Sequence, residues 1–484
     1  MAINYSSFLF LLSTVLTLYL FASCSLEKVE ANRFEEMKAN LQHQTHVVSL
    51  NSLKPADVCS TPAKGSEISS KLLKVAHKYG PCSPLKKEGK SKLLNLTQIL
   101  IDDQTRVNSI QSKISNQQST VADSTVKLPA KSGESLGTGN YVVNIGFGTP
   151  EQNFTVFFDT GSDLTWIQCL PCSRHCYTQQ DPYFNSSASS TYSNVPCGSN
   201  SCSQLKSTGY GQSSCTTNCI YGASYGDGSY TQGYYATDTL TLSSSDVFSN
   251  FEFGCGENND GTFGSTDGLL GLGRNQISMV SQTAQKYGKL FSYCLPSTTS
   301  STGFLAFGSQ AGSSSSPQYT PLLTDSNHPS FYFLNMTGIS VGGKKLSISE
   351  SVFTTSGTII DSGTVITRLA PTAYSALRSA FRQAMSKYPP APPYSLFDTC
   401  YDLSSGYNTV DIPSIVLHFG GGTDLNVDKS GILYYISSNI YCLAFAANSD
   451  DTDLEILGNT QQKTFEVVYN VAGGKLGFGA GACT

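Results

Sequence analysis

The sequence predicts a mostly β protein made of two related lobes behind a leader of different character. Charged residues are only 13% of the 484 residues, while glycine is abundant at 43. Long stretches with helical periodicity are rare, which favours short strands joined by turns. One arrangement of strand and turn residues occurs twice after about residue 139, and the chain is long enough for two such units. Length, composition and repetition together predict the duplicated β fold.

Individual elements can be placed along the chain. Residues 141–145 and 154–158 are apolar runs joined by the turn 148–150, so we expect a strand pair there. Few helices are expected. Residues 276–287 end at Gly288, and residues 372–388 follow a proline and place apolar side chains on one face, so each segment predicts a helix.

The repeated arrangement carries two aspartates. Residues 157–162 read Phe-Phe-Asp-Thr-Gly-Ser, and residues 359–364 read Ile-Ile-Asp-Ser-Gly-Thr. Farther along the chain, each copy is followed by two apolar residues and a glycine, at 269–271 and 456–458. Two pairs in the same order indicate two lobes related by a pseudo-twofold axis, because a tandem solenoid has shorter periods.

The chemistry follows from the pairing. A single Asp-Thr-Gly is weak evidence, since Asp and Gly favour turns, but two copies in matching contexts predict that Asp159 and Asp361 are catalytic. Two carboxylates that meet across a cleft cannot both ionise easily, so one keeps a proton over a wide acidic range. The ionised carboxylate can then take a proton from water while its partner donates to a substrate carbonyl. This hydrolysis needs no cofactor and no metal.

The residues after each aspartate support the pair. The hydroxyls of Thr160 and Ser362 are expected to form hydrogen bonds within their loops and hold them rigid. Gly161 and Gly363 allow close backbone approach.

Further segments carry a family resemblance. Residues 225–229 read Tyr-Gly-Asp-Gly-Ser, and Trp166 follows the first aspartate by seven residues. With the repeated segments, they make residues 139–484 resemble the pepsin-type aspartic peptidases, specifically the plant nepenthesin-like branch. The resemblance implies a bilobal pepsin-like fold with a catalytic cleft between the lobes, and an endopeptidase acting on polypeptides.

The resemblance also implies roles for single residues. Tyr225 would be the tyrosine of a hairpin flap that closes over bound peptide, and Trp166 would pack behind it and donate a hydrogen bond to its hydroxyl. Ser162 and Thr364 would lie beside the two aspartates. The residues assigned to substrate binding are therefore Trp166, Tyr225, Gly226 and Asp227.

Twelve of the fifteen cysteines follow residue 130, and an even, dense set indicates six disulfides and an oxidising compartment. A zinc site at Cys169 and Cys172 is disfavoured, because no second matching pair follows and only His175 lies near. Sequence alone leaves the connectivity open. The resemblance, which includes the Cys-rich insert 169–219, implies the pairs Cys169–Cys172, Cys176–Cys255, Cys197–Cys219, Cys202–Cys215, Cys294–Cys483 and Cys400–Cys442.

The N-terminus predicts export. Residues 8–21 are apolar, small residues follow, and the run is too short to span a bilayer, so residues 1–24 are expected to be a signal peptide. The expected product is a secreted, extracellular monomer with no membrane span. Glycosylation sequons begin at Asn95, Asn153, Asn185 and Asn335.

Residues 25–130 are expected to be a propeptide, followed by lobes at 131–316 and 317–484. Residues 25–129 have a net charge of +5 and residues 130–484 of −10. This split predicts a leader that inhibits the enzyme electrostatically and loosens as acid neutralises the body's carboxylates. The leader reads as polar and irregular, with one helix near 93–114 and a cleavable joint at 115–126.

Two alternatives remain. Residues 77–84 resemble the prosegment of a plant subgroup that includes a chloroplast nucleoid DNA-binding protease, which implies DNA binding by the leader and a plastid location; a vacuole is a third location. Alternatively, the chain is a catalytically silent, protein-binding inhibitor on the same fold, but such relatives lack parts of the aspartate pair. The match of residues 133–137 to GxSxG lacks a strand and helix around it and is read as chance.

Overall fold

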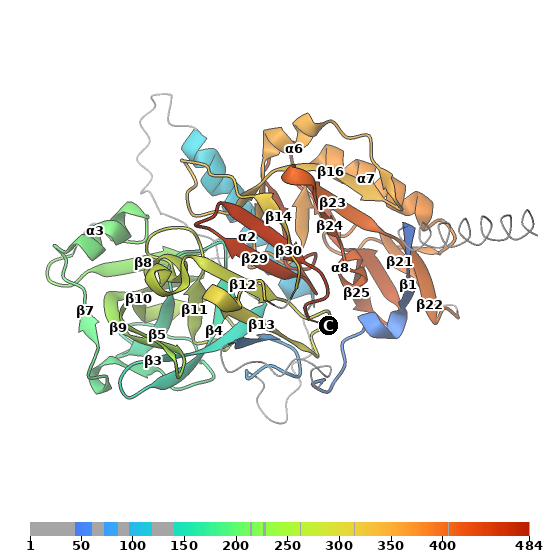
Figure 1. Cartoon of the computed structure of the whole chain (residues 1–484). Helices are drawn as coiled ribbons and strands as arrows, with labels where there is room; N and C mark the ends of the chain where they lie inside the picture. The colour runs from blue at the N-terminus through green and yellow to red at the C-terminus, as the bar shows by residue number, and fades with distance from the viewer. Residues whose placement is uncertain are drawn as a thin grey trace, which may run out of the picture.

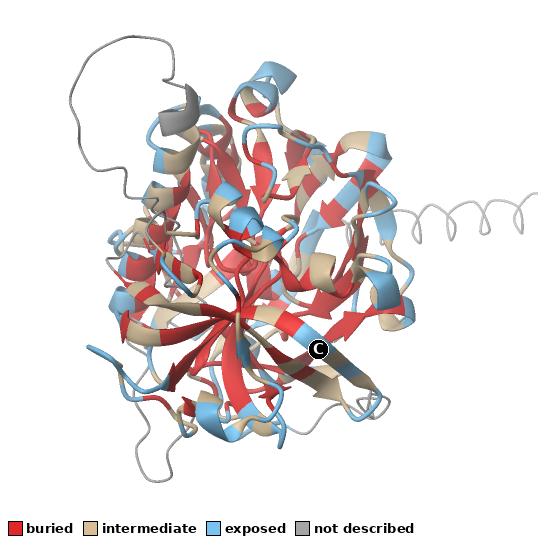
Figure 2. Cartoon of the chain, turned by 90° about the vertical axis from the view of Figure 1, so that its left-hand side faces the viewer, coloured by how far each residue is buried: buried red, intermediate tan, exposed pale blue. Residues whose placement is uncertain are grey.

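The computed structural model describes residues 44–60, 72–85, 96–118, 140–212, 215–225, 229–261, 263–313, 315–404 and 406–483. It confirms a mostly β protein with two lobes, one coloured green and the other orange to red in Figure 1. Buried residues run through the strands of both lobes (Figure 2). Within the described ranges, no helix has the length and apolar character needed to cross a membrane.

A large central sheet contains strands from the leader and from both lobes. Its first lobe grows from apolar runs whose side chains are mostly buried, as expected for strands covered on both faces. In spatial order the sheet contains β14 (Gln318–Pro321), β30 (Lys475–Gly479), β29 (Glu466–Asn470), β12 (Leu290–Cys294), β13 (Thr302–Phe307), β2 (Leu73–His77), β3 (Tyr141–Phe147), β4 (Gln152–Asp159), β11 (Gly268–Gly271), β5 (Trp166–Leu170), β10 (Asp246–Asp260), β9 (Tyr230–Ser243) and β7 (Ser193–Asn194), with β6 (Phe184–Asn185) beside β5 and β8 (Ile220–Ser224) beside β9.

The second lobe is built from smaller sheets. One carries the second aspartate and contains β15 (Phe333–Leu334), β18 (Thr358–Ile360), β28 (Glu455–Leu457), β19 (Thr367–Leu369) and β27 (Phe445–Ala447). The others are β17 (Lys344–Lys345), β16 (Met336–Val341), β23 (Ile415–Phe419) and β24 (Thr423–Asn426), and β20 (Pro390–Ala391), β21 (Cys400–Asp402), β26 (Ile440–Leu443) and β25 (Leu433–Ser437).

The predicted duplication is visible in the pairing. In the first lobe, β11 lies between β4, which is parallel to it, and β5, which is antiparallel. In the second, β28 lies between parallel β18 and antiparallel β19. Leu270 and Leu457 each lie opposite the residue that precedes an aspartate. The apolar-apolar-glycine segments are therefore the strands that support the two aspartate-bearing strands.

The helices are few. α7 (Pro371–Ala384) confirms the helix expected after the proline, and its apolar side chains are buried. The helix expected at 276–287 is instead two short helices, α4 (Met279–Gln282) and α5 (Ala284–Tyr287), because the backbone leaves helical geometry at Thr283. Gly288 ends α5 in the left-handed region, with φ of +63°. The remaining α-helices among the described residues are α2 (Leu96–Gln118), α3 (Asn200–Ser207), α6 (Glu350–Ser356) and α8 (Lys429–Ile432).

The leader contributes more structure than its composition predicts. The expected helix is present as α2, which lies between the two lobes (cyan in Figure 1). The expectation of an otherwise irregular leader is wrong, because β1 (Thr45–Ser49) pairs with β22 (Thr409–Pro413) and β2 is inserted between β13 and β3. β1 and β2 are each five residues long and include polar side chains, so their local sequence does not predict a strand. They form strands because they pair with strands of the body.

Two disulfides, Cys294–Cys483 and Cys400–Cys442, form as the resemblance implies. The other four implied pairings are wrong: the structure has Cys169–Cys255, Cys172–Cys176, Cys197–Cys215 and Cys202–Cys219. Burial explains part of the difference, since the fully buried Cys202 and Cys219 pair with each other, as do the half-buried Cys197 and Cys215. Neighbouring strands β5 and β10 bring Cys169 to Cys255. A seventh bond in the leader, Cys59–Cys82, was not anticipated.

Candidate active site

The two predicted aspartates occupy equivalent places in the two lobes. Asp159 ends β4 and Asp361 directly follows β18, and both are almost fully buried. Each carboxylate accepts a hydrogen bond from the backbone of the glycine two residues on and one from the hydroxyl three residues on. This symmetry is what a duplicated fold produces. The donors are Gly161 N (3.0 Å) and Ser162 Oγ (2.9 Å) for Asp159, and Gly363 N (3.0 Å) and Thr364 Oγ1 (2.5 Å) for Asp361.

The hydroxyls of Thr160 and Ser362 join the two loops to each other. Thr160 N donates to Ser362 Oγ (3.1 Å), and Ser362 N donates to Thr160 Oγ1 (2.9 Å). The expectation that they bond within their own loops is therefore wrong. The cross-linked hydroxyls fix one lobe's loop against the other and so set the spacing of the aspartate pair.

The two glycines are required by this close approach. A Cβ added at Gly161 would lie 2.7 Å from Asp361 Oδ1, and one at Gly363 would lie 2.5 Å from Asp159 Oδ1. Each glycine of one lobe thus faces the carboxylate of the other. A side chain at either position would collide with the opposite carboxylate and also with Arg106, a leader residue whose Nη2 lies 2.6 Å from the Cβ added at Gly161 and 2.4 Å from the one added at Gly363.

A guanidinium from the leader lies between the carboxylates. Arg106, on α2, donates to all four carboxylate oxygens and is itself buried. Its Nε donates to Asp361 Oδ2 (2.9 Å) and its Nη1 to Asp159 Oδ2 (3.3 Å). Its Nη2 donates to Asp159 Oδ1 (2.9 Å) and Asp361 Oδ1 (2.8 Å). Arg106 therefore occupies the centre of the site.

The pair is electrostatically asymmetric with the leader in place. Burial raises the pKa of Asp159 to about 6, against the attraction of Arg106, and the negative charge of Asp361 adds to the rise. Burial also opposes ionisation of Asp361, but Arg106, the Thr364 hydroxyl and the Gly363 N–H outweigh it and hold the pKa of Asp361 below its ordinary value. In weak acid the pair therefore holds one proton and one negative charge, as two adjacent carboxyls should.

The rest of α2 is seated on the second lobe. Its apolar side chains enter two clusters there, one with Leu96, Ile99 and Leu100 and one with Val107 and Ile110. Gln111 pairs with the backbone of Leu454 in both directions, at 2.7 and 2.8 Å. One turn before Arg106, Asp103 is fully buried and forms an ion pair with Arg368.

Sequence reasoning missed Arg106. One signal could have identified it: Arg106 is the only arginine of the predicted helix. It lies on the helical face that also carries the buried residues Leu100, Asp103, Val107 and Ile110. Leader length and charge alone do not indicate which basic residue enters the cleft.

The aromatic residues assigned to the flap are only partly brought together. Tyr225 is buried and its N–H donates to Ser229 O (2.7 Å), while residues 226–228, which include Gly226 and Asp227, lie outside the described residues. Trp166 is buried, but its Nε1 has no hydrogen-bond partner in the described part of the chain, so the implied bond to Tyr225 is wrong. Both rings instead contact Phe263 edge-on, at 5.0 Å for Trp166 and 5.2 Å for Tyr225.

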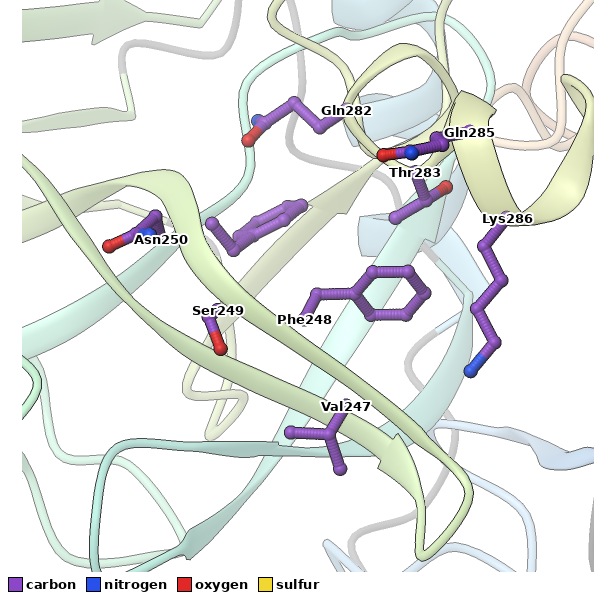
Figure 3. A pocket seen from close by; sticks show the side chains of 9 residues that line it. Val247, Phe248, Ser249, Asn250, Gln282, Thr283, Gln285 and Lys286 are labelled. Atoms are coloured by element: carbon purple, nitrogen blue, oxygen red, sulfur yellow. The ribbon is translucent and has the colours of Figure 1, made fainter.

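Two other candidate sites do not join this one. Cys169 and Cys172 are both in disulfides, which overrules zinc binding by their thiolates. A hollow of about 330 Å³ lies between β10 and the helices α4 and α5, and the labelled side chains of Figure 3 line it. Its lining includes Phe248, Asn250 and Lys286 but none of the predicted site residues.

Two buried carboxyls on matching strands, held by crossed hydroxyl bonds between duplicated lobes, define the aspartic protease class. Models of the family described as "Xylanase inhibitor N-terminal" and "Xylanase inhibitor C-terminal" match residues 141–309 and 331–480. An Arabidopsis thaliana aspartyl protease family protein is 50% identical over 446 residues, 91% of this chain and 93% of the relative. Nepenthesin-1 of Nepenthes gracilis is 39% identical over 359 residues, 72% of this chain and 79% of the relative.

The fold is also shared with solved structures. The crystal structure of basic 7S globulin from soybean has a TM-score of 0.56 at 21% identity, and the match covers 70% of this chain and 92% of that one. The chain belongs to the pepsin-like aspartic protease family, in the branch that includes nepenthesin.

Proposed function

We propose that this chain is the precursor of a secreted aspartic endopeptidase that hydrolyses peptide bonds once α2 has left the cleft. The observation that supports the proposal most is the complete aspartate pair, with each carboxylate held by a backbone N–H and a hydroxyl. After release, the ionised carboxyl of the pair accepts a proton from water, and the protonated one donates to the substrate carbonyl as the water attacks. The proton belongs to the pair, so neither residue has a fixed role.

The leader acts as the inhibitor in this proposal. Arg106 engages every oxygen that the reaction needs as proton donor or acceptor. α2 presents a side chain, not a peptide bond, to the pair, because a helix buries its backbone in its own hydrogen bonds. The leader therefore fills the cleft without being a substrate there, and cleavage elsewhere in the leader or strong acid must precede activity.

Secretion and glycosylation remain predictions. The signal segment 1–24, residues 119–126 of the expected joint, the GxSxG match and Asn95 lie outside the described residues. At residues 115–118 the expectation of a joint is wrong, because these residues are the end of α2. Asn153 is exposed on β4 and is the best placed glycan acceptor, while Asn185 and Asn335 are half-buried. The seven disulfides agree with an oxidising compartment.

Cleavage of a denatured protein at acid pH by the processed chain tests the proposal. Activity should disappear in Asp159→Asn and should be blocked by a statine-type transition-state mimic. Asp411→Asn is the matched control, because Asp411 lies on the surface in an ion pair with Lys387. Cleavage retained in Asp159→Asn would refute the assignment.

The description of the matching family models favours a second function, that of a protein-binding inhibitor. Tight binding to a xylanase by a chain that cuts no peptide would establish it. The intact aspartate pair argues against it. DNA binding by the leader also remains a prediction, and such binding should weaken steeply with salt and require residues 25–129.

A further inference from the structure

We propose that the second lobe carries a reactive serine, Ser340, which His418 and Asp424 activate as a nucleophile toward esters of short carboxylic acids. The three residues lie on β16, β23 and β24, which are neighbours in one sheet of the second lobe (Figure 1). Asp361 follows a strand of a different sheet. The inference therefore goes beyond the proposed function and does not depend on the aspartate pair.

A chain of two hydrogen bonds joins the three side chains. Ser340 Oγ lies 2.7 Å from His418 Nε2, and His418 Nδ1 lies 2.7 Å from Asp424 Oδ1. A carboxylate only accepts hydrogen bonds, so Nδ1 carries the ring proton and Nε2 accepts from the Ser340 hydroxyl. The serine thus has a base beside it and the base has an orienting carboxylate, which is the arrangement that activates a serine nucleophile.

The strand register brings these residues together on one face of the sheet. Asp424 lies directly opposite His418, and His418 lies directly opposite Gly338 on β16. Ser340 is two residues from Gly338 and therefore shares its face, so the imidazole reaches the hydroxyl diagonally across the two strands. Ile339, beside Ser340, is fully buried in the core. The three polar side chains consequently lie on the outer face of the sheet.

Gly338 leaves room above the sheet for two of the groups. A Cβ added there would lie 2.8 Å from Lys345 Cε, 3.4 Å from Lys345 Nζ and 3.7 Å from His418 Cδ2. Lys345 is directly opposite Ser340 in the pairing of β16 with β17, so its side chain crosses the face that carries the hydroxyl. An ammonium in this place can stabilise the negative charge that develops on a carbonyl oxygen when Ser340 attacks.

The exposure of the three residues limits the size of the substrate. The side chains of His418 and Asp424 are 21% and 48% exposed, whereas Ser340 keeps only 7% of its surface. Reagents can therefore approach the triad from solvent, but the hydroxyl itself admits a small group. Val416 lies directly opposite Ser340 on β23 and is half-buried, so it offers an apolar contact to a short acyl chain.

The local sequence matches a motif of serine hydrolases without its usual geometry. Residues 338–342 read Gly-Ile-Ser-Val-Gly, which fits GxSxG. That motif places its serine at a turn from strand to helix, whereas Ser340 lies within β16, ahead of a turn in which Gly342 and Gly343 have φ of +56° and +74°. The assignment therefore rests on the two hydrogen bonds, because a triad is recognised by geometry and roles.

The reaction consumes an ester and water and involves no change of oxidation state. Ser340 Oγ forms a bond to the carbonyl carbon and gives its proton to His418 Nε2. The bond from that carbon to the alcohol oxygen then breaks, and the alcohol leaves with the proton from His418. Water next attacks the acyl-serine, gives a proton to His418, and releases the carboxylic acid and free Ser340. A positioned base contributes about 10²–10⁴-fold, so we expect slow turnover.

A fluorophosphonate probe, from which a serine nucleophile displaces fluoride, tests the proposal. The full chain is treated at pH 7.5 with a statine-type inhibitor present, and the adduct is located by peptide mass spectrometry. The adduct should be on Ser340 and should be absent from Ser340→Ala. His418→Gln should slow labelling on the order of a hundredfold, since it removes the base. Ser351→Ala, which removes an exposed serine elsewhere in the lobe, is the matched control and should label as the wild type does.

Hydrolysis of p-nitrophenyl acetate gives a second measurement. After subtraction of the spontaneous reaction, turnover by the full chain should disappear in Ser340→Ala and persist in Ser351→Ala. Thermal unfolding of each variant checks the fold. Ser340→Cys covers the case in which the alanine variant does not fold: its thiol should be alkylated by iodoacetamide, and more slowly when combined with His418→Gln, because the base is lost.

The outcomes separate a reactive serine from a hydrogen-bond chain that only stabilises the sheet. No adduct on Ser340 in the wild type would overturn the proposal. Labelling of Ser340 at an equal rate in His418→Gln, or equal alkylation of the Ser340→Cys variants with and without His418, would also overturn it. None of these results bears on the aspartic protease proposal, which Asp159→Asn tests at acid pH.

Discussion

Replacing Arg106 by Gln should unlock the uncut precursor. The substitution removes the only cation that contacts both members of the aspartate pair in the described structure, and with it four hydrogen bonds to carboxylate oxygens. Breaking a buried ion pair costs about 3–5 kcal/mol. The pair can take up a proton when the cation is lost, which places the cost near the lower end, at about 3 kcal/mol. Since 1.4 kcal/mol corresponds to a tenfold change in an equilibrium constant, the fraction of precursor molecules in which α2 has left the cleft should rise on the order of a hundredfold.

The assay is the initial rate of peptide cleavage by purified precursor, with gels at each time point to confirm that the chain is still intact. Arg106→Lys should give an intermediate rate, because an ammonium cannot bridge four oxygens in a plane. Lys387→Gln is the control: Lys387 is an exposed cation in a surface pair with Asp411, and its loss should change latency little. Equal latency of Arg106→Gln and wild type would refute the reasoning, as would equal unlocking by Lys387→Gln.

Three further outcomes are expected. First, burial opposes ionisation of Asp361, but Arg106 and the hydrogen bonds from Thr364 and Gly363 outweigh it and lower the pKa of Asp361, so the contribution of this pairing to leader docking is present above about pH 4 and lost as pH falls through the lowered value; latency of the uncut precursor should therefore fall in strong acid. Second, burial raises the pKa of Glu455 to about 8, so the contribution of its protonated form to the free energy of unfolding is lost as pH rises from about 4 through 8. Glu455→Gln should reduce the change in the free energy of unfolding over this pH range by roughly 3 to 5 kcal/mol. Third, Ser362→Ala leaves the buried Thr160 N–H without its acceptor, at a cost of about 1–3 kcal/mol, and should lower kcat more than it raises KM, because it loosens the spacing of the pair.

Each outcome has its own measurement. Latency is followed as the rate of probe binding from pH 2 to 7, and latency that stays constant or increases as the pH falls below about 4 would contradict the first prediction. Thermal unfolding from pH 4 to 8 tests the second, with the exposed Glu151→Gln as control; parallel curves for Glu455→Gln and wild type would contradict it. Steady-state kinetics test the third, with the exposed Ser351→Ala as control, and an unchanged kcat would contradict it.

Repetition made the aspartate pair predictable. Asp159 and Asp361 could be named because each lies in the same local sequence, and strand order then follows from the duplicated fold. The leader could not be read in the same way. The sequence of β2 lacks the alternation of apolar and polar residues that predicts a strand, and β2 becomes a strand by pairing with β13 and β3 on either side. Arg106 is one of many basic residues in the leader, and only the fold brings it to the cleft. Four predicted disulfide pairings were wrong for a related reason, because burial and strand pairing in the folded chain decide which thiols lie close together.

The position of β2 has a consequence for activation. Because β2 is an interior strand and β1 is paired with β22, a cut between α2 and β3 leaves the leader attached by many hydrogen bonds. Before the cut, the leader rebinds from the same chain, and tethering within one chain can give effective concentrations on the order of millimolar. After the cut, the leader is a separate ligand with its own dissociation constant. Freshly cut enzyme is therefore still inhibited by the bound leader at high concentration. Activity should then appear on dilution, so concentrated and dilute solutions of the same cut enzyme differ in the fraction that is free of the leader.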